Sequence, residues 1–494
     1  MPPAAPTTTA EEPPAEGGLR RDLNLFGAVS MIVGIVIGSG IFIGVNRVAA
    51  GAGSPWLIIL VWVIGGLLTL MGALTYAELG VMFPRAGGPY VFLREGLGPL
   101  PAFLAGWTTF TVNLAGSAAA LALAFATQFN QLRPGGWMPL FPDHPEWSAK
   151  IIAACVILLI AILNYFGLRL GGNVQKSLTV LKGTLMVFLA AAALFWLGNS
   201  ASPVPGLFDA PAYQTQAAAA APVIHEGFDL AGFFGLALVA ALFAYDGWTN
   251  VTTVGSEIKN PSRNLPRAML LGIGAVIVLY ILLSFGYMHV LGLQGFADGK
   301  FAGFGDASKV AGNTASVLFG DAGLRIVAAT ILVSVLGSLN GITISGPRYY
   351  YAMARDGLFP RFFGGVNRHH VPGHSIWGQA ILSVLFLLFL DFDQLTNNVV
   401  FVSLFFYSLC AVALLVLRRR RPDLPRPYKV PLYPWIPLTY IAASMLFAGY
   451  LTYQAVLDAS GMAYRFLGLA IIAAGVPMYY AFRWYYRRGT PQPN

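Results

Sequence analysis

Charged residues are scarce in this chain. They make up 10% of its 494 residues, whereas hydrophobic residues make up 56% and the mean hydropathy is +0.66. Soluble domains usually carry about 25% charged residues, so the composition excludes an ordinary soluble globular protein. Apolar runs of roughly 17–25 residues recur along the whole length, and each is long enough to cross a hydrocarbon core of about 30 Å. The chain is therefore predicted to be an all-α polytopic protein of the lipid bilayer.

Cysteine and catalytic motifs are also scarce. Cys155 and Cys410 are the only two cysteines, and both fall inside predicted spans, where they are expected to behave as small apolar residues. His-Glu-x-x-His, Gly-x-Ser-x-Gly, Walker A and metal-spaced Cys/His sets are all absent from the sequence. The chain is therefore not expected to be an enzyme, and neither a metal nor a cofactor is predicted.

Twelve membrane spans are predicted. They lie at about 25–47, 56–82, 101–130, 149–166, 174–197, 230–256, 266–292, 322–353, 375–391, 395–417, 434–457 and 463–485. Residues 1–22, which begin with a stretch rich in Pro, Ala, Thr and Glu, are expected to form a disordered cytoplasmic tail. Residues 487–494 are expected to form a second cytoplasmic tail. No cleavable signal peptide is expected, because no basic segment precedes a short apolar one with a cleavage site.

The basic residues set the expected orientation. With the N-terminus inside, 22 of the 30 lysines and arginines, Arg348 among them, are assigned to inner loops, tails and the adjoining ends of spans, and Lys182 alone lies deep in a span. This positive-inside bias predicts a multi-pass protein of the inner (plasma) membrane with both termini in the cytoplasm. It also accounts for the formal net charge of +9 without a nucleic-acid partner.

Helix-weakening sequence interrupts two of the spans. "GIVIGSGIF" at 34–42 places three glycines in span 1, and "FAYDGWTNV" at 243–251 places Asp246 and Gly247 in span 6. An unpaired backbone group in hydrocarbon costs several kcal/mol, so such breaks persist where they line a cavity. Glycines at this spacing can alternatively serve close helix packing. Breaks at corresponding positions of two repeats, however, indicate a transporter's central site.

The broken ends suit a zwitterion. The N-terminal end of a half-helix offers free N–H groups and a positive dipole end to a carboxylate, whereas C-terminal ends offer free carbonyls to an ammonium. An α-amino acid carries both groups. A channel, the alternative outside the transporter class, would usually be lined by polar groups along several helices, whereas polar residues here concentrate at two breaks.

Five stretches together resemble the amino acid–polyamine–organocation (APC) superfamily, and most of all its L-type amino acid transporter branch in a prokaryotic form. They are "GIVIGSGIF", "YAELGVMFPRAGGPYVFLREGLGPLPAFLAGW", "LFAYDGWTNVTTVGSEIKNPSRNLPRAM", "LGSLNGITISGPRYYYAMARDGLFP" and "LRRRRPDLPRPYKVPLYPWIP". The resemblance implies the LeuT-like fold of twelve transmembrane helices, with helices 1 and 6 broken. Its implied parts are a first inverted repeat (23–197), an extracellular loop (198–229), a second inverted repeat (230–419) and two further helices (420–486).

The resemblance also assigns a substrate site at the two breaks. Its residues are Val36, Ser39, Gly40, Ile41, Phe243, Ala244 and Asp246. The N–H groups of Ser39, Gly40 and Ile41, with the Ser39 hydroxyl, would meet the substrate carboxylate, and the carbonyls of the other four would meet its ammonium. Phe243 also resembles the family's outer aromatic gate, although a core aromatic is the alternative.

Two departures from the family bear on partners and selectivity. No cysteine lies between residues 129 and 151, where the mammalian branch bonds a heavy subunit, so no disulfide-linked heavy subunit is expected. In span 10, Phe406 and Tyr407 stand where the large neutral transporters have an Asn-Trp pair, which leaves the size preference open.

Acidic residues at membrane depth are functional candidates by default. For Glu78 and Glu257, structural ion pairs with arginines near the inner end are favoured over proton transfer. Asp246 lies beside the expected ammonium site. It is expected either to brace the break or to offer a counter-charge to cationic side chains.

Lys182 is the basic residue deep in a span. Burying an ammonium costs at least a few kcal/mol, so it needs partners, and Ser334 and Ser338 of span 8 are expected to lie near it. In the resembling family a lysine at this position points to where sodium-coupled relatives hold their ion. The chain is therefore predicted to be a sodium-independent exchanger of neutral L-amino acids that works by alternating access. The alternatives are a proton-coupled permease, or one that also accepts cationic amino acids.

Overall fold

The computed structural model describes residues 19–38, 40–42, 44–45, 48, 55–132, 144–197, 229–297, 309–389, 392–457 and 467–488. Throughout these residues the regular structure is helical, apart from two isolated bridges, Leu23 with Ile258 and Ala86 with Val254. Most of the two predicted tails and of loop 198–229 lies outside the described residues.

The helices follow the predicted spans. In chain order they are α1 (Leu25–Val36), α3 (Pro55–Met82), α4 (Pro89–Leu97), α5 (Pro99–Thr108), the π-helical turn η2 (Thr109–Asn113), α6 (Leu114–Gln131), α7 (Pro145–Tyr165), α8 (Leu168–Leu194), α10 (Asp229–Ala244), the 3₁₀ turns η3 (Trp248–Thr253) and η4 (Gly255–Glu257), α11 (Pro261–Ala297), α12 (Lys309–Phe319), α13 (Asp321–Arg355), η6 (Arg361–Gly364), α14 (Gly373–Phe389), α15 (Phe392–Arg420), α16 (Trp435–Leu457) and α18 (Leu467–Arg488).

Six of these helical segments are long and apolar enough to cross a membrane: α3, α5–α6, α7, α8, α11 and α13. Shorter apolar helices include α1, α14 and part of α16. The membrane class is therefore confirmed, and the count of twelve spans stays a prediction. Two helices that the sequence did not predict, α4 and α12, connect longer ones.

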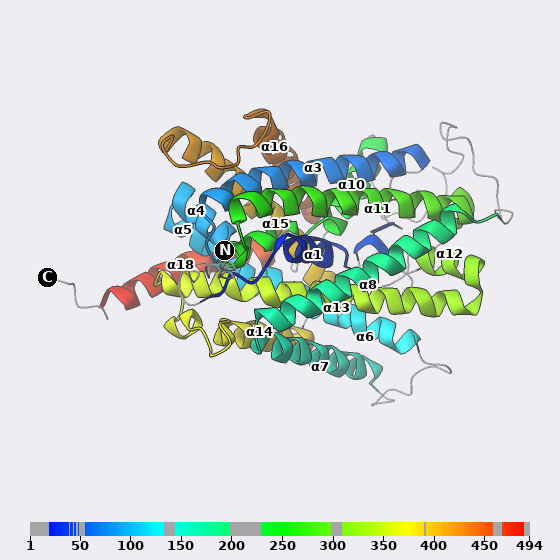
Figure 1. Ribbon diagram of the computed structural model, residues 1–494, viewed down its shortest axis with the longest axis horizontal. Helices are drawn as coiled ribbons and strands as arrows, with labels where there is room; N and C mark the ends of the chain where they lie inside the picture. The colour runs from blue at the N-terminus through cyan, green and yellow to red at the C-terminus, as the bar shows by residue number, and fades with distance from the viewer. Residues whose placement is uncertain are drawn as a thin grey trace, which may run out of the picture.

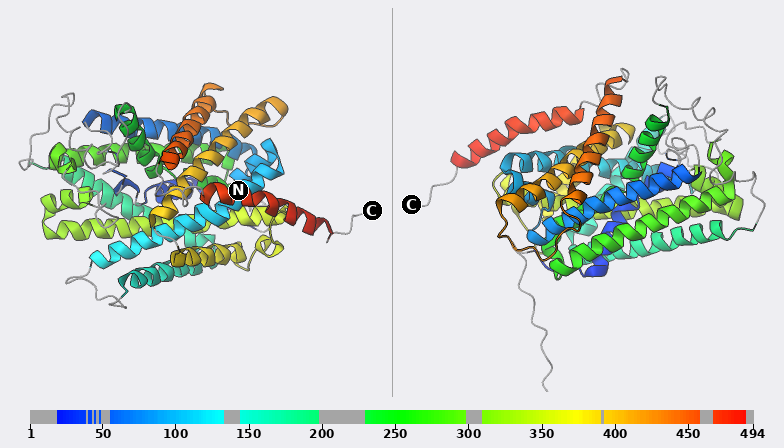
Figure 2. Two further views of the ribbon diagram at one scale, coloured as in Figure 1. Left: turned by 180° about the vertical axis from the view of Figure 1, so that it is seen from behind. Right: turned by 90° about the horizontal axis from the view of Figure 1, so that it is seen from above.

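The interrupted helix α1 lies in the middle of the bundle (Figure 1). It packs against α8, α11, α13 and the η3 turn. Helix α11 runs along α3 on one side of α1, and α13 runs along α6 on the other. The last two helices, α16 and α18, lie at the periphery (Figure 2). Because α1 is enclosed on several sides, its irregular backbone is shielded from lipid, as the break requires.

The predicted ion pairs are present at the end of the bundle expected to face the cytoplasm. Glu78 of α3 accepts from Arg418 (Nε–Oε1 2.8 Å, Nη2–Oε2 2.5 Å) and from the backbone N–H of Val430 (2.7 Å). Glu257 pairs with Arg348 through two bonds of 2.9 Å. One correction concerns Arg348, which is counted with the inner loops although it falls near the end of the predicted span 322–353. It lies inside α13, and both side chains of the pair are 1% exposed.

Removing one member of this buried pair is expected to destabilise the protein strongly. Glu257→Leu leaves the Arg348 guanidinium buried without its counter-charge, which should lower the free energy of unfolding by about 3–5 kcal/mol. The matched control is Arg169→Ala. Arg169 is 75% exposed in its pair with Asp22, so its loss should change stability by about 0–1 kcal/mol. Thermal unfolding of the purified proteins checks both, and equal effects of the two variants would contradict the expectation.

Candidate substrate site

The first break begins where α1 ends, at Val36. Ile37 still donates its N–H to Val33 O (3.0 Å), but it has φ −76° and ψ 81°, and Gly38 N donates to Val36 O at 2.8 Å. This is an inverse γ-turn, which ends the helical ladder. Helical geometry resumes at residues 40–42. The last carbonyls of α1 are thus left without their intrahelical donors.

Lys182 and two serines supply those donors. The Lys182 ammonium, on α8, donates to Gly34 O (2.6 Å) and Ile37 O (2.5 Å). From α13, Ser334 Oγ donates to Ile37 O (2.7 Å) and Ser338 Oγ to Ile35 O (2.9 Å). Lys182 is fully buried, and among the described residues no carboxylate pairs with it. The Lys182 amino group therefore sits against carbonyl dipoles at the break.

The second break follows α10, which ends at Ala244. A turn at 245–247 leads into the 3₁₀ turn η3. Gly247 has φ +101°, a left-handed conformation that favours glycine. A Cβ at Gly247 would also lie 2.5 Å from Ile35 Cγ2 of α1. The predicted break at Asp246-Gly247 is therefore present, and its glycine brings it against α1.

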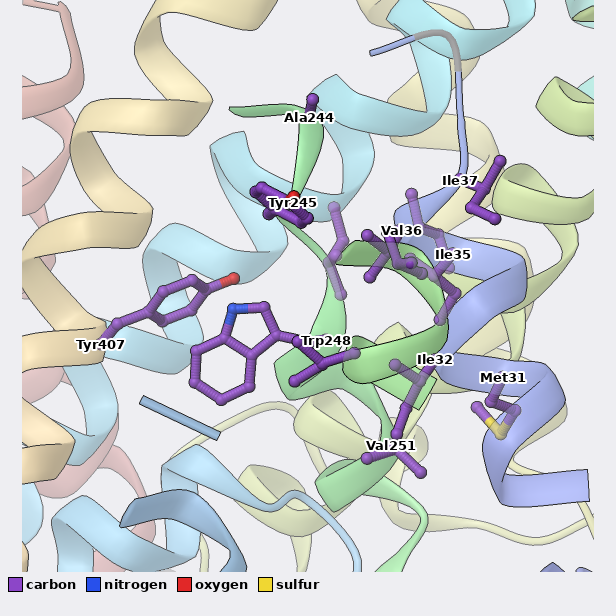
Figure 3. Packing of buried hydrophobic residues seen from close by; sticks show 14 of the residues in the cluster. Met31, Ile32, Ile35, Val36, Ile37, Ala244, Tyr245, Trp248, Val251 and Tyr407 are labelled. Carbon is purple, nitrogen blue, oxygen red and sulfur yellow. The ribbon is translucent and has the colours of Figure 1, made fainter. Parts of the chain in front are cut away.

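The contact between the two breaks is reciprocal. A Cβ at Gly40, just past the first break, would lie 2.9 Å from Ala244 Cα at the end of α10. Each break thus presents a glycine to the last turn of the other helix. Figure 3 shows Ile32, Ile35 and Val36 of α1 facing the segment that runs from Ala244 to Val251.

A pocket opens between these breaks and three further helices. Ile35, Val36, Gly38 and Gly40 line it from the first break, and Phe243, Asp246, Gly247 and Asn250 from the second. Its remaining walls are formed by small, apolar and amide side chains of η2 and α6, by two α13 residues and by one α15 residue: Asn113, Leu114, Ser117, Ala120, Leu121, Ser338, Ile342 and Tyr407. Backbone from both breaks therefore borders a single cavity.

Asp246 is held in place by hydrogen bonds. The Tyr407 hydroxyl donates to Asp246 Oδ1 at 3.0 Å, and Thr249 Oγ1 donates to the Tyr407 hydroxyl oxygen at 3.1 Å. The ring of Tyr407 also packs against Trp248, with centroids 5.7 Å apart (Figure 3). One carboxylate oxygen of Asp246 is thus engaged by Tyr407.

Amide side chains complete a polar band around the pocket. Asn250 Nδ2 donates to Gly247 O (3.0 Å), and its Oδ1 accepts from Ser345 Oγ (2.9 Å). Asn113, at the end of the π-helical turn η2, donates to Ser403 Oγ (2.8 Å). π-helical turns occur frequently at functional sites.

The structure brings most of the expected site residues together, but not all of them. Val36, Gly40, Phe243, Asp246 and Tyr407 line the pocket. Ile41, Ala244 and Phe406 are buried and are not among its lining residues. Ser39 lies outside the described residues. The sequence did not single out Asn113, Ser117 or Asn250, although an asparagine inside an apolar span is a visible signal.

Known proteins resemble the chain over nearly its full length. A family profile described as "Amino acid permease" matches residues 23–476. The "Serine/threonine exchanger SteT" of Bacillus subtilis (strain 168) is 30% identical over 474 residues, which cover 95% of this chain and 98% of that protein. "b(0,+)-type amino acid transporter 1" of Mus musculus is 29% identical over 96% of this chain and 90% of that protein. "Large neutral amino acids transporter small subunit 2" of Mus musculus is 30% identical over 97% and 84%.

Replacing Gly40 by leucine is expected to abolish uptake of amino acids while the protein still reaches the membrane. The new side chain would meet the α10 backbone at Ala244 and fill the pocket beside it. Gly274→Leu is the control, because a Cβ at Gly274 would meet nothing within 4 Å. Uptake of radiolabelled L-amino acids, normalised to protein in the membrane, measures the difference. Normal uptake by Gly40→Leu would argue against a site at the breaks.

Proposed function

The chain belongs to the amino acid permease family, and from this premise we propose that it is a sodium-independent exchanger of neutral L-amino acids. It is an amino acid transporter of the membrane and not an enzyme. The observation that carries the finer proposal is the pocket bordered by both breaks. Alternating access around this pocket, across twelve spans arranged as two inverted repeats with both termini in the cytoplasm, completes the proposal.

The geometry of the breaks supports an α-amino acid as the substrate. The helical residues 40–42 begin beside the pocket, and the N–H groups of a first helical turn have no intrahelical acceptors. They suit a carboxylate, as does the positive end of the helix dipole. The carbonyls of Val36 and Phe243, at the ends of α1 and α10, suit the ammonium. We propose that a zwitterion spans the gap between these groups.

Neutral side chains are favoured by the rest of the lining. The wall from α6 presents Leu114, Ser117, Ala120 and Leu121. The printed names of the relatives refer to a serine/threonine exchanger and to transporters of large neutral amino acids. The carboxylate of Asp246 is engaged by Tyr407, which supports a bracing role. A counter-charge for cationic side chains is the second candidate.

Lys182 supports independence from sodium. Its ammonium occupies the carbonyls of Gly34 and Ile37, which are the kind of oxygen ligands that a sodium ion would need. An ammonium at this place supplies hydrogen-bond donors to the carbonyls of the first break without an added cation. Since the name of one relative describes it as an exchanger, obligatory exchange is the proposed mode. Proton coupling remains the alternative, because a buried lysine is able to lose its proton.

Liposomes that contain the purified protein test the mode of transport. Uptake of radiolabelled L-serine or L-leucine should require internal amino acid and should be unchanged when external sodium is replaced by choline. Uptake that depends on a sodium gradient would refute the proposal. Uptake into empty liposomes driven by a pH gradient would favour the proton-coupled alternative.

Lys182→Ala should lower exchange by about tenfold or more, since it removes the shortest hydrogen bonds to Gly34 O and Ile37 O, and a hydrogen bond from a charged donor contributes about 1.5–3 kcal/mol. The control is Lys176→Ala. Lys176 lies six residues earlier on α8 and bonds the Asn173 side chain at 3.3 Å, so its variant should exchange at the wild-type rate. Normal exchange by Lys182→Ala would remove the argument for sodium independence.

Asp246→Asn separates the two roles proposed for that residue. As a brace, asparagine still accepts the Tyr407 hydrogen bond, so the ratio of lysine uptake to leucine uptake should stay constant. If Asp246 acts as a counter-charge, the ratio should fall by roughly a hundredfold or more, as expected when a buried ion pair loses one partner. Competition of unlabelled lysine and leucine for uptake in liposomes measures the ratio.

A further inference from the structure

The last carbonyls of both interrupted helices converge on one hydroxyl group. Tyr280 Oη, on α11, lies 3.0 Å from Ala244 O and 3.3 Å from Val36 O. Ala244 is the last residue of α10, and Val36 is the last residue of α1. A tyrosine hydroxyl has a single proton. It therefore donates to one of the two carbonyls at a time.

The tyrosine ring is held independently of its hydroxyl. Tyr280 is fully buried, and its ring packs against Trp62 (centroids 5.3 Å apart) and Tyr245 (5.1 Å apart). Tyr245 is itself fixed, because its hydroxyl donates to Trp62 O at 3.1 Å. The Tyr280 oxygen is thus presented to the two carbonyls by a packed aromatic cluster.

Which carbonyl accepts the Tyr280 proton determines how many donors Val36 O has. A carbonyl oxygen has two lone pairs, and the Gly38 N–H already takes one of those at Val36 O, at 2.8 Å. When Tyr280 donates to Ala244 O, the nearer of the two, Val36 O accepts only from the Gly38 N–H and can take one further donor; Val36 is a lining residue of the pocket. The Tyr280 oxygen then keeps its own lone pairs as further acceptors.

We propose that Tyr280 is the positioning residue of the ammonium subsite. Its hydroxyl holds the ends of α1 and α10 at the separation that an ammonium needs, and leaves Val36 O free to accept from the substrate. The inference rests on the proposed function, and it adds a third helix, α11, to the groups that determine recognition of the amino group. The subsite is complete only when both broken helices are docked on Tyr280.

Tyr280→Phe tests this role, because it removes the oxygen and keeps the ring that packs against Trp62 and Tyr245. The matched control is Tyr287→Phe. Tyr287 is also fully buried on α11, but its hydroxyl has no hydrogen-bond partner within the described residues. Both proteins are reconstituted in liposomes that contain unlabelled L-leucine, and exchange against radiolabelled L-leucine gives KM and the maximal rate. Thermal unfolding in detergent verifies that each variant is folded.

Tyr280→Phe should raise KM about tenfold and leave the maximal rate within about twofold, as expected when one polar partner in a buried site is lost. Tyr287→Phe should change neither quantity. Tyr280→His, which keeps a ring N–H donor, should give a KM between those of the wild type and Tyr280→Phe. A KM for Tyr280→Phe equal to that of Tyr287→Phe would overturn the assignment, and so would a lower maximal rate with KM unchanged.

Competition by an analogue identifies the group that Tyr280 serves. The α-hydroxy acid with the leucine side chain has the carboxylate but lacks the ammonium. In the wild type, L-leucine should inhibit uptake far better than this acid, and Tyr280→Phe should reduce that preference about tenfold by weakening L-leucine alone. An equal loss for both compounds would overturn the inference while leaving the proposed function intact. A wild type that does not distinguish them would overturn the proposed function, and this inference with it.

Discussion

The carbonyl groups stranded at the end of α1 are the constraint on which the centre of this protein depends. In a membrane, water does not satisfy them, and each would cost several kcal/mol if left unpaired. The chain answers with donors from two different helices, the Lys182 ammonium of α8 and the hydroxyls of Ser334 and Ser338 of α13. Lys182 has no carboxylate partner in the part of the chain that the structure describes, and its burial is tolerated for the same reason. The carbonyls need its protons as much as the ammonium needs their oxygens.

The second break is tied to the first by close backbone approach. Gly247 meets Ile35, and Gly40 meets Ala244, at distances where a Cβ would force one segment away from the other. The ends of α1 and α10 therefore lie against each other, and α11 packs against α1. The polar bonds from α8 and α13 reach these ends from the other side. Any movement that opens the pocket must keep the glycine contacts or break them together, while the long and flexible Lys182 side chain is able to follow.

The parts of this site that sequence alone predicts are those whose residue types are anomalous in hydrocarbon. Three glycines in span 1, Asp246 and Lys182 all stand out against an apolar background, and each lies at or beside the breaks. Tyr280 does not stand out, since it is one of 21 tyrosines and its partners lie 36 and 244 positions away along the chain. The buried Arg348 was misplaced for a related reason. A rule that treats arginine as a marker of inner loops has no means to recognise a partner such as Glu257, 91 positions distant.

The turn at the end of α1 separates two groups of carbonyls, and this separation bears on charge during exchange. Gly34 O, within the helix, and Ile37 O, at the turn that ends it, both meet Lys182, whereas Val36 O lies 3.3 Å from the Tyr280 hydroxyl. One set is held by a fixed ammonium, and the other is left for the ammonium of a substrate. In the proposed cycle the two cations never compete for the same oxygens. A neutral amino acid enters and leaves as a zwitterion, the Lys182 charge stays in place, and each turn of exchange moves no net charge, so no accompanying sodium ion is required to balance it.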